Sequence, residues 1–217
     1  MQSKNITKVL KPRLAKELPI LEVSREELEE YASVSSGIVK DCFLEDCESR
    51  KVTFKEVLFK NAVFSNVSLQ QCELMDVRFE NSDLSNVDFR ESSIHRVEFI
   101  NCKLLGVNLT EAVLKNIGFS ECNGQYSLFR FAELNQVVFN KCQLRSSDFS
   151  ESQFSKVEFE SSDLTQSQMF GVKLKGIDFS SCEIDELATG VENIRGAIVS
   201  TAQAISLTSL LGLVIKE

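Results

Sequence analysis

The sequence predicts an all-β fold, a square tube of stacked coils, and three observations carry this prediction. The first is a period of five: from Leu44 to Ile184 a large apolar residue occupies every fifth position, with Ser49 and Gly124 as exceptions. This period leaves no continuous apolar stripe on a helix and no single inner face on an unbroken strand. The backbone must therefore turn a corner every five residues.

The second observation is an inward partner for each of these central residues. The residue two positions before the centre is small or β-branched, as Ser82 is before Leu84 and Val87 is before Phe89. In extended backbone these two side chains share one face, and the residue between them points to the other. The two residues that remain in each unit make the corner.

The third observation, a secondary repeat of twenty residues, sets the number of corners. Every twentieth residue from Phe59 is phenylalanine, and the residue two before it is Val or Ile. A fifteen-residue spacing shows no such constancy, so the sequence predicts four corners per coil and about seven coils, a rod about 35 Å long. The predicted structural Phe ladder is Phe59, Phe79, Phe99, Phe119, Phe139, Phe159 and Phe179.

Residues 1–36 lie outside this register, and we expect them to form a basic arm followed by a cap. Ser24 and Glu27 have the spacing of a capping box, which predicts a short acidic helix or turn over residues 25–31. A cap would protect the open strand edges of the first coil. The basic residues of the arm are Lys4, Lys8, Lys11, Arg13 and Lys16, and both prolines, Pro12 and Pro19, are here too.

The predicted β-helix spans residues 37–199, and residues 200–217 form a helix and tail. Ser200 is the expected N-cap of a helix that runs from Thr201 to about Leu211. The segment is more apolar than a surface helix requires, so it is either a lid on the last coil or a dimer interface. We expect both, with a two-fold homodimer joined at the C-terminus. The predicted dimerisation residues are Ile205, Leu207, Leu210, Leu211 and Leu213.

All seven cysteines occupy the inward position for small residues. There is no CxxC pair, and the single histidine, His95, falls on an outward position of another wall. We therefore expect buried free thiols rather than disulfides or a metal site, and no cofactor. The N-terminus is polar and no run of eighteen apolar residues exists, so we expect neither a signal peptide nor a membrane span, and a cytoplasmic protein.

Charge is concentrated in the array. The chain has a net charge of −8, and residues 41–190 hold 24 acidic and 15 basic residues, a balance of −9, so the flanks add +1. The acidic residues gather on two adjoining walls, and such a rod would repel nucleic-acid phosphates rather than bind them. The candidate acidic partner-binding residues are Glu80, Asp83, Glu98, Glu158, Glu160, Asp163, Asp178, Glu183 and Asp185.

Gly124 is a missing centre near the outward apolar residues Tyr126, Leu128 and Phe131. Two interpretations compete. Tyr126 or Phe131 folds back to compensate for a weak coil, which we favour, or the three residues form an apolar contact patch beside Arg130. Elsewhere the outward Ser, Asp and Glu residues lie along flat walls over a filled interior, and catalysis needs a recessed group of converging side chains. We therefore expect no enzyme.

The repeated unit of a small or β-branched residue, a polar residue, Leu or Phe, and two polar residues resembles the pentapeptide repeat family over about 150 of the 217 residues. The resemblance implies a right-handed quadrilateral β-helix. Residues 193–200 and the apolar helix after them are similar to the C-terminal dimerisation module of single-domain members. Among those members are the Qnr-type and mycobacterial fluoroquinolone-resistance proteins, which bind DNA gyrase and topoisomerase IV as acidic, duplex-like rods.

Two functions follow from this resemblance and from the charge. In the first, the rod mimics DNA, binds a type II topoisomerase and protects it from fluoroquinolones. In the second, it is a generic protein-interaction scaffold without topoisomerase activity.

Overall fold

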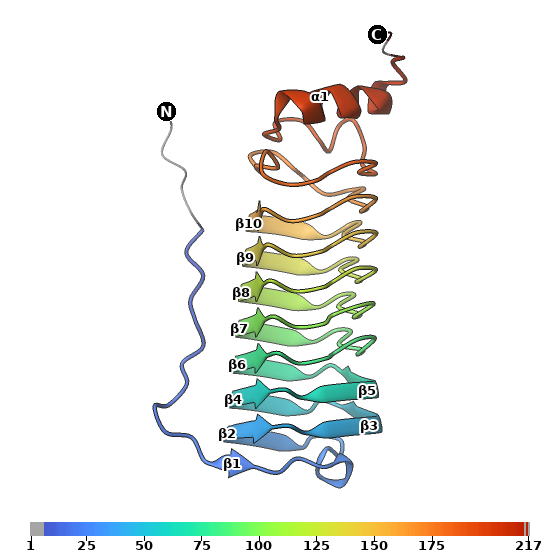
Figure 1. Ribbon diagram of the computed structural model, residues 1–217. Coiled ribbons are helices and arrows are strands. Elements are labelled where there is room, and N and C mark those ends of the chain that lie inside the picture. Colours follow the sequence, from blue (N-terminus) through green and yellow to red (C-terminus); the bar gives the residue numbers. More distant parts are fainter. Residues whose placement is uncertain (1–6, 215, 217) are drawn as a thin grey trace.

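The computed structural model describes residues 7–214 and 216, and in it the chain winds as a stack of coils closed by a helix (Figure 1). Most coils contribute one eight-residue strand that spans two neighbouring walls of the tube. The elements are β1 (Ile20–Leu21), η1 (Arg25–Glu27), β2 (Ser33–Lys40), β3 (Phe43–Arg50), β4 (Thr53–Lys60), β5 (Val63–Gln70), β6 (Glu73–Glu80), β7 (Ser93–Ile100), β8 (Val113–Ser120), β9 (Glu133–Asn140), β10 (Gln153–Glu160), α1 (Thr201–Leu207) and η2 (Thr208–Leu211).

The strand register follows the twenty-residue repeat. An eight-stranded parallel sheet has the order β1-β2-β4-β6-β7-β8-β9-β10, and β3 pairs with β5 in a second sheet. Phe59 pairs with Phe79, and Val97 pairs with Ile117. In the coils above β5 the other two walls keep the same register as isolated bridges, such as Asp83 with Lys103. The predicted fold class, a quadrilateral β-helix of about seven turns with a C-terminal helix, is confirmed.

The corners depend on residues in the left-handed region. Nearly every fifth residue has a positive φ, for example +59° at Asn86 and +56° at Glu91. Each lies two positions after a central residue, which is where the predicted corner falls. Asn and Asp tolerate this conformation best among residues with a Cβ, and asparagine is frequent at these positions.

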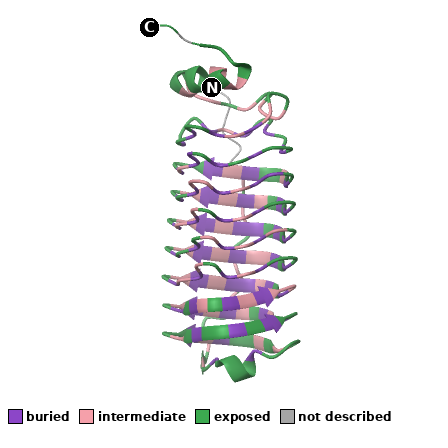
Figure 2. Cartoon of the chain, turned by 90° about the vertical axis from the view of Figure 1, so that its right-hand side faces the viewer, coloured by how far each residue is buried: buried purple, intermediate pink, exposed green. Residues whose placement is uncertain are grey.

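The Phe ladder fills one side of the interior. Its seven rings are almost completely buried and stack in sequence, with centroids 4.7 to 5.8 Å apart. Other rings meet the ladder edge-on, as Phe129 does against Phe139 at 5.8 Å. Buried residues largely alternate with exposed or partly buried ones along the strands (Figure 2). The predicted ladder is confirmed, and its stacked rings fill this side of the tube's interior.

The N-terminal cap closes the first coil. β1 pairs in parallel with β2, Ile20 opposite Ile38, and Leu28 is buried beneath the coil. The Ser49 hydroxyl, which occupies a central position, donates to the carbonyl of Leu28. The helix or turn expected over residues 25–31 is reduced to the short η1, and the backbone N–H of Ser24 donates to Glu27 at 2.9 Å in the expected capping box.

At Gly124 the favoured prediction is wrong. Tyr126 and Phe131 do not fold back over the coil, since they are 57% and 50% exposed. The space is filled from the next coil, because Leu144 Cδ2 lies 3.0 Å from where a Gly124 Cβ would stand. A residual cavity of about 10 Å³ remains, and the buried Ser127 hydroxyl at its edge has no hydrogen-bond partner.

At the C-terminal end, α1 and η2 run continuously to Gly212, which ends the helix with a φ of +69°. Ser200 caps α1 as expected, accepting from the N–H of Gln203. The Gln203 side chain donates to the carbonyls of Phe179 at 2.8 Å and Cys182 at 2.7 Å. The helix is therefore a lid on the last coil, but it leaves apolar side chains exposed: Ile205, Leu211, Leu213 and Val214.

No disulfide joins the seven cysteines, which all lie within residues 7–214, and all but Cys42 are buried. Within residues 7–214 and 216, no cluster of three or more His, Cys, Asp or Glu side chains is arranged to hold a metal ion. The same part of the chain contains no helix with the length and apolar content to cross a membrane.

Candidate protein-binding surface

The predicted basic arm is a docked segment. Residues 7–19 run along the outside of the tube, from the coil that contains β10 down to β1 (Figure 1). They follow the wall that the Phe ladder fills, which we call the Phe-ladder wall. Three backbone N–H groups of the arm donate to side chains of three different coils. These bonds join Thr7 to Glu158 Oε1 (2.5 Å), Leu10 to Asn116 Oδ1 (3.2 Å) and Arg13 to Asp76 Oδ1 (2.9 Å).

Asp76 anchors the lower end of the arm. Its carboxylate accepts two hydrogen bonds from the Arg96 guanidinium, both 2.6 Å, in addition to the one from the Arg13 backbone. Burial raises the pKa of Asp76, but the hydrogen bonds from Arg96 and Arg13 and the charges of both guanidinium groups outweigh it, so the pKa falls below its usual range. Asp76 is therefore an anion at neutral pH.

The lower acidic residues of the Phe-ladder wall are paired with basic neighbours. Glu98, whose side chain is only 14% exposed, lies 2.7 Å from Arg78 and 4.0 Å from Lys11 of the arm. Glu80 lies 3.6 Å from the same Arg78 and 3.8 Å from Lys60. Neither carboxylate offers an unpaired charge to a partner.

Other acidic candidates have a local structural role. Asp83 accepts from the N–H and hydroxyl of Ser85, at 3.1 and 2.6 Å, and Asp163 accepts from the N–H of Thr165 at 2.9 Å. Burial raises the pKa of each aspartate, but these hydrogen bonds and a nearby cation lower it overall. This Asx-turn geometry secures the chain as it enters the corner. These turns were not predicted above, although the Asp-x-Ser/Thr spacing in the sequence indicates them.

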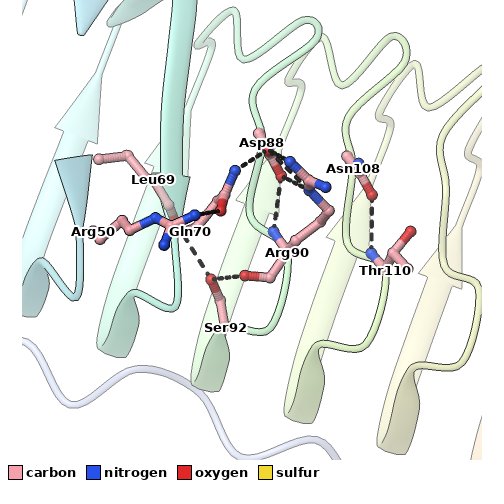
Figure 3. Close-up of polar contacts among 8 residues, drawn as sticks. All are labelled: Arg50, Leu69, Gln70, Asp88, Arg90, Ser92, Asn108 and Thr110. Carbon is pink, nitrogen blue, oxygen red and sulfur yellow. Dashed lines mark hydrogen bonds and ion pairs between the residues drawn. The ribbon is translucent and has the colours of Figure 1, made fainter. Parts of the chain in front are cut away.

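The same motif stands on the wall opposite the Phe ladder (Figure 3). Asp88 accepts from the backbone N–H and the guanidinium of Arg90, at 3.1 and 2.8 Å. Gln70 donates to Asp88 at 2.9 Å and accepts from Arg50 at 2.8 Å. Outward polar residues of successive coils thus satisfy one another along the rod.

The structure divides the predicted acidic residues into two groups. The lower group, Glu80, Asp83 and Glu98, is paired with Lys and Arg, and in the upper group Asp163 is paired with Arg145 at 3.3 Å. Between the groups, Gly118 and Val138 take the outward position that Glu98 and Glu158 hold. The upper group gathers near the C-terminal end, in two adjacent coils, and we call it the upper acidic cluster: Glu158, Glu160, Asp163, Asp178, Glu183 and Asp185.

Two further surfaces are open. A groove of about 680 Å³ follows the other edge of the Phe-ladder wall, lined by polar residues such as Asn101, Glu121 and Lys141. The predicted apolar residues Tyr126, Leu128 and Phe131 lie on the opposite wall, where the Arg130 guanidinium stands 5.6 Å from the Phe131 ring centre. Their side chains belong to one coil.

The sequence matches the family model described as the pentapeptide repeat region over residues 92–169 and 128–189, and the model of pentapeptide repeats (8 copies) over residues 72–110. No relative among the curated proteins matches the chain.

Similar solved structures include a trypsin-treated point variant of QnrB1, described as a plasmid-mediated fluoroquinolone resistance protein, with 18% identity and a TM-score of 0.41 over 87% of this chain and 99% of that one. HetL from the cyanobacterium Nostoc sp. strain PCC 7120, described as involved in heterocyst differentiation regulation, has 14% identity and a TM-score of 0.38 over 78% and 85%. A protein from the Arabidopsis thaliana thylakoid lumen has 16% identity and a TM-score of 0.32 over 60% and 74%.

These likenesses are too distant to carry an argument about function. The two family models together cover residues 72–189, more than half of the sequence. The chain belongs to the pentapeptide repeat family.

Proposed function

We propose that this protein is a non-enzymatic, cytoplasmic rod that binds a type II topoisomerase, DNA gyrase or topoisomerase IV, in the place of DNA, and so protects it from fluoroquinolones. The upper acidic cluster carries this proposal. It sets six carboxylates on two adjoining walls of a rigid tube, and Glu160, Glu183 and Asp185 are exposed to solvent. An enzyme surface that holds duplex DNA is cationic and would meet these carboxylates in a fixed arrangement.

The rigidity of the interior supports this proposal. The stacked rings hold the coil spacing, so the backbone that carries the carboxylates loses little conformational entropy on binding. The charge is sparser than in DNA, about one net charge per 4 Å of rod against one per 1.7 Å of duplex. A rigid acidic surface of similar width still gives electrostatic steering toward a cationic partner.

The proposed active form is a homodimer joined at the C-terminus. Ile205, Leu211 and Leu213 expose apolar surface on the lid, and Leu207 and Leu210 are only partly buried. A two-fold contact between lids would bury these side chains and place two rods end to end. Sedimentation of a monomer at micromolar concentration would remove this part of the proposal.

A scaffold for another protein partner is the second candidate, and one observation favours it. Tyr126 and Phe131 are aromatic and exposed, the Arg130 guanidinium stands over the Phe131 ring, and these residue types are enriched at protein interfaces. They lie on the wall opposite the Phe ladder, away from most of the acidic residues.

Gyrase supercoiling assays with and without a fluoroquinolone separate these candidates. The topoisomerase proposal expects inhibition or protection by the wild-type protein at micromolar concentration. The triple variant Glu160→Lys, Glu183→Lys and Asp185→Lys should lose it. The matched control is Glu73→Lys, Glu133→Lys and Glu151→Lys, which makes the same charge change at exposed positions of other walls. Absence of any effect of the wild type at tens of micromolar favours the scaffold.

A further inference from the structure

The repeat of the tube and the repeat of the docked arm are commensurate. Thr7, Leu10 and Arg13 are three residues apart, and the side chains that accept their N–H groups are two coils apart. Three residues of extended chain advance roughly 10 Å, and two coils rise roughly 9.6 Å. A straight peptide can therefore continue this pattern of hydrogen bonds along the rod without adjustment.

The intermediate coil also takes part. The Gln136 side chain donates to the carbonyl of Lys8 at 3.0 Å, between the contacts of Thr7 and Leu10. Each coil from Asn116 to Glu158 thus contributes a polar contact to the arm backbone. Such contacts read an extended backbone rather than particular side chains, as in other modes of extended-peptide recognition.

The arm presents its side chains in two sets. Val9, Pro12 and Leu14 are partly buried, whereas Lys8 and Lys11 are exposed. Lys11 approaches Glu98 on the wall at 4.0 Å. The matching peptide is therefore extended, with apolar residues directed to the tube and basic residues beside its acidic side.

The arm covers polar side chains at this corner. Asp76 and Asn116 are 4% and 2% exposed, whereas Asn81 and Asn101, which hold the same left-handed corner conformation at the other edge of the wall, are exposed. Buried polar groups are costly unless they are hydrogen-bonded. With the arm in place, Asn116 accepts from Leu10 and Asp76 accepts from Arg13 and Arg96.

We propose that this corner is a recognition site for extended basic–apolar peptides and that the arm is its resident intramolecular ligand. A protein partner that inserts a segment of this kind must displace residues 7–14. Only then does it reach Glu98 and Glu158. The peptide site stands on its own geometry, and the claim that the displaced arm uncovers part of the topoisomerase-binding wall rests on the proposed function.

A peptide binding assay on the full-length protein tests the site. The probe is a fluorescent synthetic peptide with the sequence of residues 7–18, and the control probe is a scrambled peptide of the same composition. The arm is weakened by Val9→Asp and Leu14→Asp, which place charges at its partly buried positions. Because a tethered ligand acts at high effective concentration, the peptide should bind this variant about 10- to 100-fold more tightly than the wild type.

The added substitution Asn116→Ala should remove most of that gain, whereas Asn101→Ala at the uncovered edge should leave it unchanged. If the scrambled peptide binds as tightly as the arm peptide, the proposed site is wrong. The site is also wrong if the arm peptide does not bind the arm-weakened variant while the circular dichroism spectrum shows that this variant is folded. If the wild-type protein associates with itself as its concentration rises, and the arm-weakened variant does not, the arm binds a second copy of the chain. That result would overturn the intramolecular ligand. No topoisomerase enters this assay, so its outcome is separate from that of the supercoiling test.

Discussion

The two edges of the Phe-ladder wall have the same backbone and opposite surroundings. At one edge, the corner residues from Asp76 to Gln136 lie beneath the arm, and two of them are buried. At the other, the corner residues from Asn81 to Lys141 line an open groove. The pentapeptide repeat produces both corners, so their difference comes from a segment outside the repeat.

This difference shows how a repeat protein acquires an individual surface. The interior is fixed by a periodic pattern, and any coil resembles the next. The outward residues are free of that pattern, and the non-repetitive arm selects one corner among four. Function in such a rod is therefore decided by outward residues and by whatever lies on them.

The largest effect is expected from the interior that both edges share. Phe119→Ala should lower the free energy of unfolding by about 3 to 5 kcal/mol, because it removes a buried ring stacked 4.9 and 4.7 Å from its neighbours. Urea denaturation followed by circular dichroism measures it. The exposed Lys115→Ala, the control, should change stability by less than about 0.5 kcal/mol. If Phe119→Ala leaves the free energy of unfolding almost unchanged, the Phe ladder does not stabilise the wall that carries the two edges.

A matched pair of asparagines compares the two edges directly. Asn116→Ala should cost about 1 kcal/mol more than Asn101→Ala, since it leaves the arm N–H of Leu10 without its buried acceptor. Both positions have a positive φ, +57° and +52°, so the backbone strain of alanine is similar and cancels. The same denaturation experiment applies. Equal costs for the two variants would mean that the arm contributes nothing at its corner.

Acidification should release the arm at its lower end. The pKa of Asp76 is lower in the folded protein than the value of about 3.9 in an unfolded chain, so its contribution is complete above that value and is lost as the pH falls through the folded pKa. We expect the Arg13 amide to be protected from hydrogen exchange at pH 5 and to lose this protection only after the pH has fallen below the usual aspartate pKa of about 3.9. In Asp76→Asn the protection should vary much less over this interval, and an identical pH dependence would assign the release to other groups.

The smallest effect concerns the interior beside the open groove. Gly124→Ala should stabilise the protein by about 0.5 to 1 kcal/mol, because alanine restricts the unfolded chain and fills a small cavity. Leu144 Cδ2, 3.0 Å from the new Cβ, is the end of a flexible side chain and can shift. Thermal unfolding provides the measurement. A loss of stability would mean that Leu144 is already fixed in the place of the missing centre.

The sequence was sufficient for the interior, except at Gly124, and insufficient for the surface. The Phe ladder and the four corners follow from the five- and twenty-residue periods, and the C-terminal helix follows from the capping signal at Ser200. The ion pair between Glu98 and Arg78 joins outward residues of adjacent coils. The repeat does not restrict the residue types at outward positions, so it does not predict this pair.

The docked arm contacts residues that are 63 to 151 positions away in the sequence. Its contacts recur every three arm residues, a period that the five-residue repeat does not contain. The compensation at Gly124 also escaped prediction. It depends on the space beside Leu144 in the next coil, and the aromatic residues that are close in sequence point outward.

Amide hydrogen exchange of the full-length protein at neutral pH, resolved by residue with NMR, tests the docked arm most directly. The structure predicts an alternation along the arm, with slow exchange at Leu10 and Arg13 and faster exchange at Lys8 and Lys11. Uniform exchange at the rate of an unstructured peptide from residue 7 to residue 14 would contradict the docked arm.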